Sequence, residues 1–404
     1  MGRSVTAAVA SGAGDHYCEG AAQLQPGPGF FRPDSRPSRD LGVLLLADLA
    51  AAAPGRPLQV LDAMAGCGIR ALRYGLEVLA GRPAGDQLWV NDADPDRQPL
   101  LRRNLQPLQI SGLALTLQAE TAQQLLARAL LDRRRFDLLD LDAFGCPAAL
   151  LPLALEAVRV GGLLYLASTD GRSPTGHDRP AALRQLGAAA RAHPASWELA
   201  LRLQIGVVAR TAWAQGRGVE PLLSFSEGRT FRTALRLRQR PKPQELAQLG
   251  LLAHCHQCGD QQVQSLLQLR QWQPCLCVAS APLAISGPLW IGPLQHGATL
   301  ARLQQHAGAL DTGPQLAAAG QRLLARLLAD PGDLPRCWPT SSIGRCLGGG
   351  PPPLAPLATA LQQAGYRASA SGVMPSQLRS DAPWAQILAT SRQLARGGLG
   401  GTAK

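Results

Sequence analysis

The stretch Val60–Arg70, with the sequence VLDAMAGCGIR, decides the fold of this chain. Its apolar start is typical of a buried strand, and its two glycines are typical of a sharp loop. Its last residues are typical of the first turn of a helix. Glycines allow the backbone to approach a ligand closely, and a helix start offers free N–H groups. The stretch therefore predicts a strand, a loop and a helix that line a binding site.

Strands and helices alternate outward from this stretch. Apolar runs separated by amphipathic segments indicate a parallel sheet that is covered on both faces. A hairpin over 219–226 and 230–238 is expected to close this sheet. We predict strands at 58–63, 87–92, 114–118, 136–142 and 162–169, and helices at 39–53, 70–79, 96–108, 122–131, 147–158, 204–215 and 298–329.

An acid follows the strand after the glycine loop. In open α/β sheets, ligands bind at the carboxyl ends of the strands. The carboxylate of Asp92 at such an end can accept hydrogen bonds from both hydroxyls of a ribose. The loop and the acid together indicate an adenosyl ligand, and their spacing leaves open a dinucleotide or S-adenosylmethionine.

Two more acids end the strand predicted at 136–142. Asp140 and Asp142 are two residues apart, so their side chains share one face, and burying them is costly unless they are used or hydrated. A carboxylate that accepts the N–H bonds of an aryl amine raises the electron density on nitrogen and can take its proton. The ring of Phe144 can stack on a flat base. The pattern indicates methylation of an amine on a nucleobase.

These motifs together resemble the tRNA guanine-26 N2-dimethyltransferases, which have Asp-Pro-Phe-Gly where this chain has DAFG at 142–145. The resemblance spans nearly the whole chain. It implies an α/β fold: a class I, Rossmann-like S-adenosylmethionine-dependent methyltransferase domain with a smaller α+β C-terminal domain. Other matching stretches are EG at 19–20, FFRP at 30–33, SRDL at 38–41, 161–170, RGVEPLLSFS at 217–226, GPLWIGPL at 287–294, YRAS at 366–369 and DAPW at 381–384.

The resemblance also implies roles for individual residues. The reaction would place one or two methyl groups on N2 of guanine 26 of tRNA, with position 27 as a further candidate. The target base is expected to lie against Phe30, Asp142 and Phe144, although Phe30 and Phe31 are alternatively core residues. S-adenosylmethionine is expected to contact Arg39, Arg70, Asp92, Glu120 and Thr121.

This chain departs from the family pattern at several places, and among them Arg32 and Ser38 replace asparagines while Glu120 and Thr121 replace Asp and Ala. Ala143 replaces the signature proline, which leaves the loop after Asp142 less constrained. Ala370–Gly372 stands where the family has a Thr-His pair. Two alternatives to a guanine-26 tRNA methyltransferase stay open. One is a tRNA-binding chaperone that has lost catalysis, and the other is a methyltransferase for another RNA or for a protein.

Four cysteines downstream are spaced like metal ligands. Cys255-x-x-Cys258 and Cys275-x-Cys277 are two close pairs, as in a zinc ribbon, although the second pair has one spacer where two are usual. His254 or His256 is an alternative ligand, and free buried thiols are the alternative to zinc. Cys67 and Cys146 are expected to be packing residues, because methyl transfer of this kind needs no thiol.

Length and charge complete the prediction. The chain has 404 residues and a formal charge of +12, which favours a polyanionic partner such as tRNA, although a GC-rich genome would also enrich arginine. We expect a methyltransferase domain at 1–238 and a tRNA-binding region at 239–404, with the zinc module at 246–298. Neither a signal peptide nor a membrane span is predicted, and we expect a cytoplasmic monomer.

Overall fold

The computed structural model describes residues 16–29, 31–82, 85–275, 277, 282–308 and 316–399, so Phe30 lies outside the described residues. The chain forms two compact units. The first comprises 1–142, 153–165 and 301–324, and the second comprises 143–152, 166–300 and 325–404. Among the described helices, none is long and apolar enough to cross a membrane.

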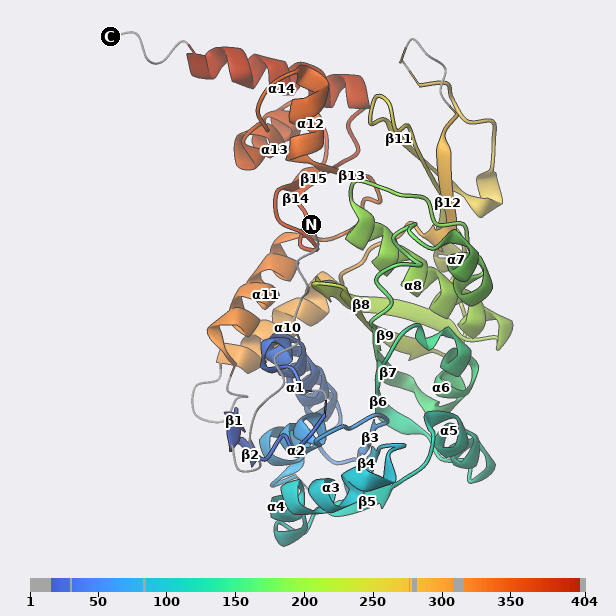
Figure 1. The fold of residues 1–404 in the computed structure, drawn as a ribbon, viewed down its shortest axis with the longest axis vertical. Helices are drawn as coiled ribbons and strands as arrows, with labels where there is room; N and C mark the ends of the chain where they lie inside the picture. Colours follow the sequence, from blue (N-terminus) through green and yellow to red (C-terminus); the bar gives the residue numbers. More distant parts are fainter. Residues whose placement is uncertain are drawn as a thin grey trace. The chain divides into compact units, whose positions relative to one another are not determined.

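The predicted sheet is confirmed. Seven strands lie in the order β5-β4-β3-β6-β7-β9-β8, in which β3 pairs in parallel with β4 and β6, and β8 pairs antiparallel with β9 (Figure 1). Val60 and Leu61 point to opposite faces of β3 and are both fully buried, as expected of a central strand. The strands are β3 (Gln59–Asp62), β4 (Gln87–Asn91), β5 (Ala114–Gln118), β6 (Phe136–Ala143), β7 (Val158–Ser168), β8 (Gly218–Glu227) and β9 (Thr230–Arg238).

The helices of the first unit follow the prediction with one break. The helix expected at 96–108 is divided at Leu105, because Pro107 has no N–H to continue the first helix. Helix α5 begins at a capping box of Thr121 and Gln124. The elements are β1 (Tyr17–Glu19), β2 (Ala22–Leu24), α1 (Arg36–Ala52), α2 (Ile69–Tyr74), a π-turn (Gly75–Leu79), α3 (Gln98–Asn104), α4 (Gln106–Ile110), α5 (Ala122–Leu131) and α6 (Leu151–Ala157).

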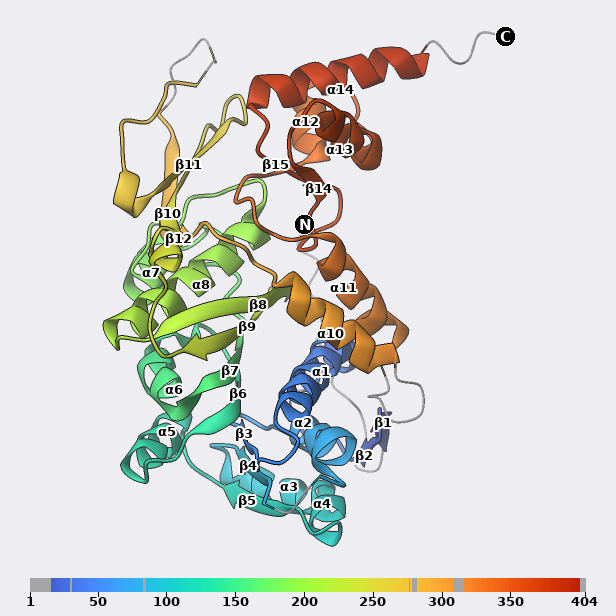
Figure 2. The ribbon, with the colours of Figure 1, turned by 180° about the vertical axis from the view of Figure 1, so that it is seen from behind.

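The first unit also includes a segment from late in the chain. The predicted helical stretch 298–329 forms two helices, α10 (Gly297–Gly308) and α11 (Ala318–Ala329). Arg302 on α10 makes an ion pair with Asp48 on α1 at 2.7 Å, and the N–H of Ala317 donates to Asp40. Helix α10 therefore lies beside α1, although about 250 residues separate them, and Figure 2 shows the pair from behind.

The second unit is built on the long helix α8 (Ser196–Ala214). Gly206 on α8 lets the helix approach the strand β12 closely, because a Cβ there would lie 3.0 Å from the Cα of Leu289. Leu199 and Leu203 on the same helix join one apolar cluster with Leu252. The other elements here are α7 (Arg179–Leu186), α9 (Pro243–Leu246), β10 (Leu249–His254), β11 (Gln261–Ser265) and β12 (Ala284–Trp290), and the three strands form an antiparallel sheet.

The C-terminal module is residues 337–399 of the second unit. Its sheet has the order β13-β15-β14, and its three helices share a core with Trp338, Leu357 and Trp384. The rings of Trp338 and Trp384 stack with centroids 5.5 Å apart. The elements are β13 (Cys337–Pro339), α12 (Thr340–Leu347), α13 (Leu354–Gln363), β14 (Ala368–Ala370), β15 (Gln377–Ser380) and α14 (Trp384–Leu399).

A buried ion network fastens this module to α8. The guanidinium of Arg379 on β15 is fully buried and binds both carboxylate oxygens of Glu198, at 2.6 and 3.0 Å, and those of Asp330. Arg202, one turn beyond Glu198, also donates to Glu198. Burial opposes ionisation of Glu198, but Arg379 and Arg202 outweigh it and lower the pKa of Glu198. The group is stable only while each charge keeps its partners.

Replacement of Arg379 should therefore destabilise the second unit strongly. Arg379→Ala would leave Glu198 and Asp330 buried without this cation, at a cost of about 3–5 kcal/mol in the free energy of unfolding. The exposed Arg184→Ala should change it by less than about 0.5 kcal/mol. Urea unfolding followed by circular dichroism compares the two, and equal midpoints would contradict the structural role of Arg379.

Candidate functional site

The glycine loop lies where the sequence places it, after β3. Gly66 and Gly68 have φ of 56° and 83°, a left-handed conformation that other residues rarely adopt. The N–H of Gly66 donates to Oδ2 of Asp92 at 2.8 Å, and Oδ1 of Asp92 accepts from the N–H of Asp94. Asp92 is thus held directly over the loop at the end of β4, and its side chain is half-buried.

Asn91 fastens three strand-end loops together. Its Nδ2 donates to the carbonyl of Ala63 at 3.0 Å and to that of Glu120 at 2.9 Å, while its Oδ1 accepts from the N–H of Glu120. The loops after β3, β4 and β5 therefore form one rigid edge. Asn91 is a functional residue that the sequence motifs did not reveal, although it directly precedes the predicted strand-end acid Asp92.

Two of the residues that are predicted to contact the donor, Glu120 and Thr121, follow the end of β5. Glu120 makes an ion pair with Arg128 at 3.0 Å, and Thr121 caps α5. Because β5 pairs with β4, this end neighbours Asp92. The structure thus brings Asp92, Glu120 and Thr121 to one edge, where a nucleoside could span them.

Arg39 on α1 binds the N-terminal arm, the part of the chain before α1. Its guanidinium binds Glu19 through two hydrogen bonds of 2.7 and 2.6 Å and also donates to the carbonyls of Arg32 and Pro33. The ring of Phe31 lies 5.5 Å from this guanidinium. Burial opposes ionisation of Glu19, but Arg39 overcomes it and lowers the pKa of Glu19. Arg39 therefore holds the arm on α1, and its contact with a donor stays a prediction.

Arg70 binds the carboxylates at the end of β6. It is almost fully buried, and it donates to Asp142 at 3.1 Å and to Asp140 at 3.5 Å. The hydroxyl of Tyr74 donates to Asp140 at 2.6 Å. The prediction that Asp140 and Asp142 share a face is confirmed, because one guanidinium reaches both. We had not predicted that Arg70 joins them.

A third carboxyl group adjoins this cluster. Asp62 ends β3 directly beside Asp140, and both residues are buried. Burial, and then the charge of Asp140, raise the pKa of Asp62 well above its ordinary value. The side chain of Asp142 is 27% exposed, in contrast. Of the three carboxyl groups, only that of Asp142 is open to a substrate.

The loop after Asp142 is ordered without the signature proline. The N–H of Gly145 donates to Oγ1 of Thr169 at 2.7 Å, and the N–H of Thr169 donates back to the carbonyl of Gly145. Ala143 is buried as the last residue of β6, whereas Phe144 is 74% exposed. Hydrogen bonds to Thr169 therefore replace the constraint that proline would supply.

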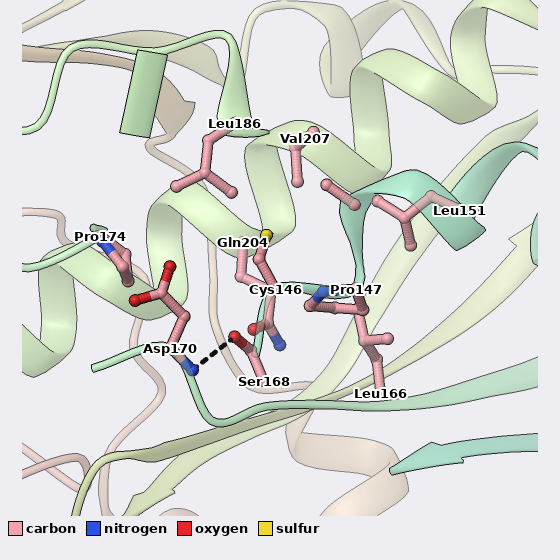
Figure 3. A pocket seen from close by; sticks show the side chains of 11 residues that line it. Cys146, Pro147, Leu151, Leu166, Ser168, Asp170, Pro174, Leu186, Gln204 and Val207 are labelled. Carbon is pink, nitrogen blue, oxygen red and sulfur yellow. Dashed lines mark hydrogen bonds between the residues drawn. The ribbon is translucent and has the colours of Figure 1, made fainter. Parts of the chain in front are cut away.

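A small cavity behind this loop is no substrate pocket. Figure 3 shows it lined by Cys146, Leu186 and Val207, with Asp170 at its edge. Its volume of about 10 Å³ holds roughly one water molecule. Burial raises the pKa of the Cys146 thiol, which disfavours the thiolate. Cys146 packs against apolar neighbours, as the sequence predicts.

The four predicted metal ligands converge in the second unit. The Sγ atoms of Cys255, Cys258, Cys275 and Cys277 all lie within 4.8 Å of one another, and that of Cys255 is 3.5 Å from Cys275 and 3.8 Å from Cys277. Sulfurs bound to one tetrahedral zinc at about 2.3 Å lie about 3.8 Å apart. The four-thiol set therefore fits zinc despite the Cys-x-Cys spacing.

Backbone N–H groups favour the thiolate of one of these four residues, Cys255. Burial opposes ionisation of Cys255, but the N–H groups of Cys258 and Gln257 lower its pKa to about 7. The turn is fixed by the C-terminal module, since Trp384 donates to the carbonyl of Cys258 at 2.7 Å and Trp338 to that of Gly259 at 2.8 Å. The metal knuckle, residues 255–259, thus rests on the stacked tryptophan pair.

Comparison with known proteins extends over almost the whole chain. The model of the family described as N2,N2-dimethylguanosine tRNA methyltransferase matches residues 19–392. The tRNA (guanine(26)-N(2))-dimethyltransferase of Methanoculleus marisnigri is 32% identical over 368 residues, which cover 89% of this chain and 91% of that protein. The enzyme of the same name from Pyrococcus abyssi is 28% identical over 382 residues, which cover 90% and 93%.

A solved structure has a similar fold. It is described as a complex of Trm1 from Pyrococcus horikoshii with S-adenosyl-L-methionine. The TM-score is 0.78, with 24% sequence identity, over 93% of this chain and 99% of that chain. The likeness supports the architecture described above, including the smaller C-terminal module.

The raised pKa of Asp62 predicts that folding stability decreases as the pH rises. The folded protein keeps the Asp62 proton to a higher pH than the unfolded chain does, so stability is lost as pH rises above the ordinary aspartate pKa. Asp62→Asn should raise the melting temperature more at about pH 8 than at about pH 5. The exposed Asp132→Asn is the control, and a gain that is equal at both pH values would contradict this account.

The metal site makes a separate prediction. Purified protein should contain about one zinc per chain, and Cys258→Ser or a chelator should release it and lower the melting temperature. Cys18→Ser, which removes an exposed thiol, should retain both the metal and the stability. Elemental analysis without zinc, together with a melting temperature that a chelator leaves unchanged, would favour free thiols.

Proposed function

The chain belongs to the N2,N2-dimethylguanosine tRNA methyltransferase family, and we propose that it transfers methyl groups from S-adenosylmethionine to the exocyclic N2 of guanine 26 in tRNA. One or two methyl groups are transferred to each guanine. The observation that carries this proposal is Asp142, a carboxylate that Arg70 holds at the open end of β6. The donor supplies a methyl group on a sulfonium, which leaves as a neutral thioether.

Asp142 addresses the weak nucleophilicity of the guanine amine. The lone pair on N2 is delocalised into the ring, so a hydrogen bond from N2–H to the carboxylate raises electron density on nitrogen. It also orients N2 in line with the methyl group. As the N–C bond forms and the S–C bond breaks, the proton on N2 passes to Asp142. Asp62 and Asp140 are too buried for this role.

Phe144 is proposed to stack on the target base. Its side chain is exposed directly after the end of β6, two residues beyond Asp142 in the chain. A flat base on this ring would be both bound and oriented. Guanine 26 is paired or stacked within tRNA, so the enzyme is expected to extrude it, and Phe30 is the proposed second wall of the pocket.

The donor is proposed to bind the edge that Asn91 makes rigid. Asp92 would accept hydrogen bonds from the ribose hydroxyls, and Glu120 and Thr121 would flank the adenine. Arg39 and Arg70 are proposed to face the rest of the donor. Because Arg70 also binds Asp142, one guanidinium would then link the donor site to the proton acceptor.

The remainder of the chain is proposed to bind tRNA. We assign residues 1–238 to catalysis and 239–404 to tRNA binding, and the zinc module at 246–298 would stabilise the latter. The formal charge of +12 suits a polyanion, and recognition is expected to follow RNA shape through contacts with phosphates. We further propose a monomer that acts in the cytoplasm.

The product tests the proposal directly. Unmodified tRNA transcript incubated with the protein and S-adenosylmethionine should yield methylated guanosine at position 26 on mass spectrometry of nuclease fragments. Replacement of guanine 26 by adenine in the transcript should abolish the product. Donor binding without any methylated nucleoside would favour a chaperone, and methylation confined to ribosomal RNA or protein would identify a different substrate.

The role of Asp142 has its own test. Asp142→Asn should reduce the single-turnover rate at least roughly a hundredfold, the scale of a lost general base, while tRNA and donor affinities stay within about tenfold. Phe144→Ala should raise the activation free energy of methyl transfer by about 1–3 kcal/mol, because the stacking contact is lost. The control Asp132→Asn removes an exposed carboxylate and should react at the wild-type rate. A wild-type rate for Asp142→Asn would remove Asp142 from the mechanism.

A further inference from the structure

The C-terminal module has a groove of its own. The glycine and proline loop at 348–353 forms one side, and the helix α14 forms the other. Its volume of about 370 Å³ is within the range of ligand sites. The lining residues are Leu347, Gly349, Gly350, Pro351, Pro352, Pro353, Ser391, Arg392, Ala395 and Arg396.

The charge of this groove is entirely positive. Arg392 and Arg396 are exposed on α14, and no carboxylate is among the lining residues. They are four residues apart, so they share a face of the helix and repel each other. No ion pair is found for either side chain among the described residues. The pair therefore suits an anion from outside the chain.

The rest of the module contrasts with this pair. Asp381 is the sole acid between Leu334 and Arg396 in the sequence, and it is bound to Arg367 at 2.8 Å. The buried Arg379 is neutralised by Glu198 and Asp330. The arginines that serve structure are thus paired, whereas those of the groove face solvent.

The loop on the other side is shaped for close approach of a backbone. A Cβ at Gly349 or Gly350 would meet no atom within 4 Å, so their backbone is open to the groove. Pro351–Pro353 have no N–H groups and restrict the chain, which provides a stiff apolar wall. A sugar-phosphate strand matches both sides of the groove. Its phosphates would bind the arginines, and its ribose rings would pack against the prolines.

We propose that this groove binds the ribose-phosphate backbone of the substrate tRNA. The inference rests on the proposed function and adds an anchoring site in the C-terminal module, which contributes affinity but takes no part in methyl transfer. Phosphates of any sequence fit it equally well, so its contribution is salt-dependent and independent of the nucleotides bound there.

A pair of double variants tests this site. Arg392→Gln with Arg396→Gln removes the groove charges, and Arg179→Gln with Arg184→Gln removes two exposed charges from α7 as a matched control. Dissociation constants for tRNA are measured across a salt series. The groove variant should bind about tenfold more weakly at physiological salt, with its log–log salt slope reduced by about 1.5, while the control stays within about twofold.

A single substitution within the groove provides a second, independent test of the site. Gly350→Glu places a carboxylate in open space within the groove, so it should weaken tRNA binding without changing the melting temperature. S-adenosylmethionine affinity, and the single-turnover rate at saturating tRNA, should match wild type in every variant. These two readouts separate an anchoring site from damage to the catalytic unit.

Two outcomes would overturn the proposal: a groove variant and a control that bind tRNA alike, or polyglutamate that binds the wild-type groove as tightly as tRNA does. Failure of the proposed function is a different result. In that case wild-type protein would methylate no guanine 26, whatever its affinity for tRNA. If methylation occurs but the groove variants keep wild-type affinity and salt slope, only the anchoring site is refuted.

Discussion

The proposed catalytic site at the end of β6 depends on one guanidinium that binds two of three neighbouring carboxyl groups. Asp62, Asp140 and Asp142 lie at the ends of two adjacent strands, and Arg70 is the cation that reaches Asp140 and Asp142. Burial and mutual repulsion favour the protonated form of Asp62. The cluster therefore has one partly exposed carboxylate, that of Asp142 at the end of β6, where we propose that the guanine amine binds. Because these groups are buried or partly buried charges, Asp140 and Asp142 are stable as carboxylates only while Arg70 stays bound to them.

The sequence predicted those features that depend on local pattern. The strands around 60, 90, 116 and 139 have apolar cores and polar ends, so a parallel sheet with Asp92 and Asp142 at the ends of its strands followed directly. Close cysteine pairs likewise predicted the four-thiol cluster, and the structure brings all four together. The departure to Ala143 suggested a loose loop, but Thr169, distant in the sequence, fixes it.

Other features depend on partners that no local pattern reveals. Arg39 was predicted to contact the donor, and Glu19 lies in a stretch that matches the family, but the hydrogen bond between them is revealed only by the fold. The network of Arg379 with Glu198 and Asp330 joins residues that are up to 181 positions apart. Asn91 was passed over because an amide beside an acid has no distinctive spacing. Long-range polar contacts are thus the part of the site that sequence reasoning missed.

The most direct measurement is the single-turnover methylation rate of Arg70→Gln at saturating tRNA and donor. Tyr74→Phe is the matched control, because it removes the other hydrogen bond to Asp140 and leaves the bond to Asp142 intact. The account predicts a fall of at least about tenfold for Arg70→Gln, since the geometry of Asp142 is lost, and a near wild-type rate for Tyr74→Phe. A wild-type rate for Arg70→Gln would contradict the claim that Arg70 positions the proton acceptor.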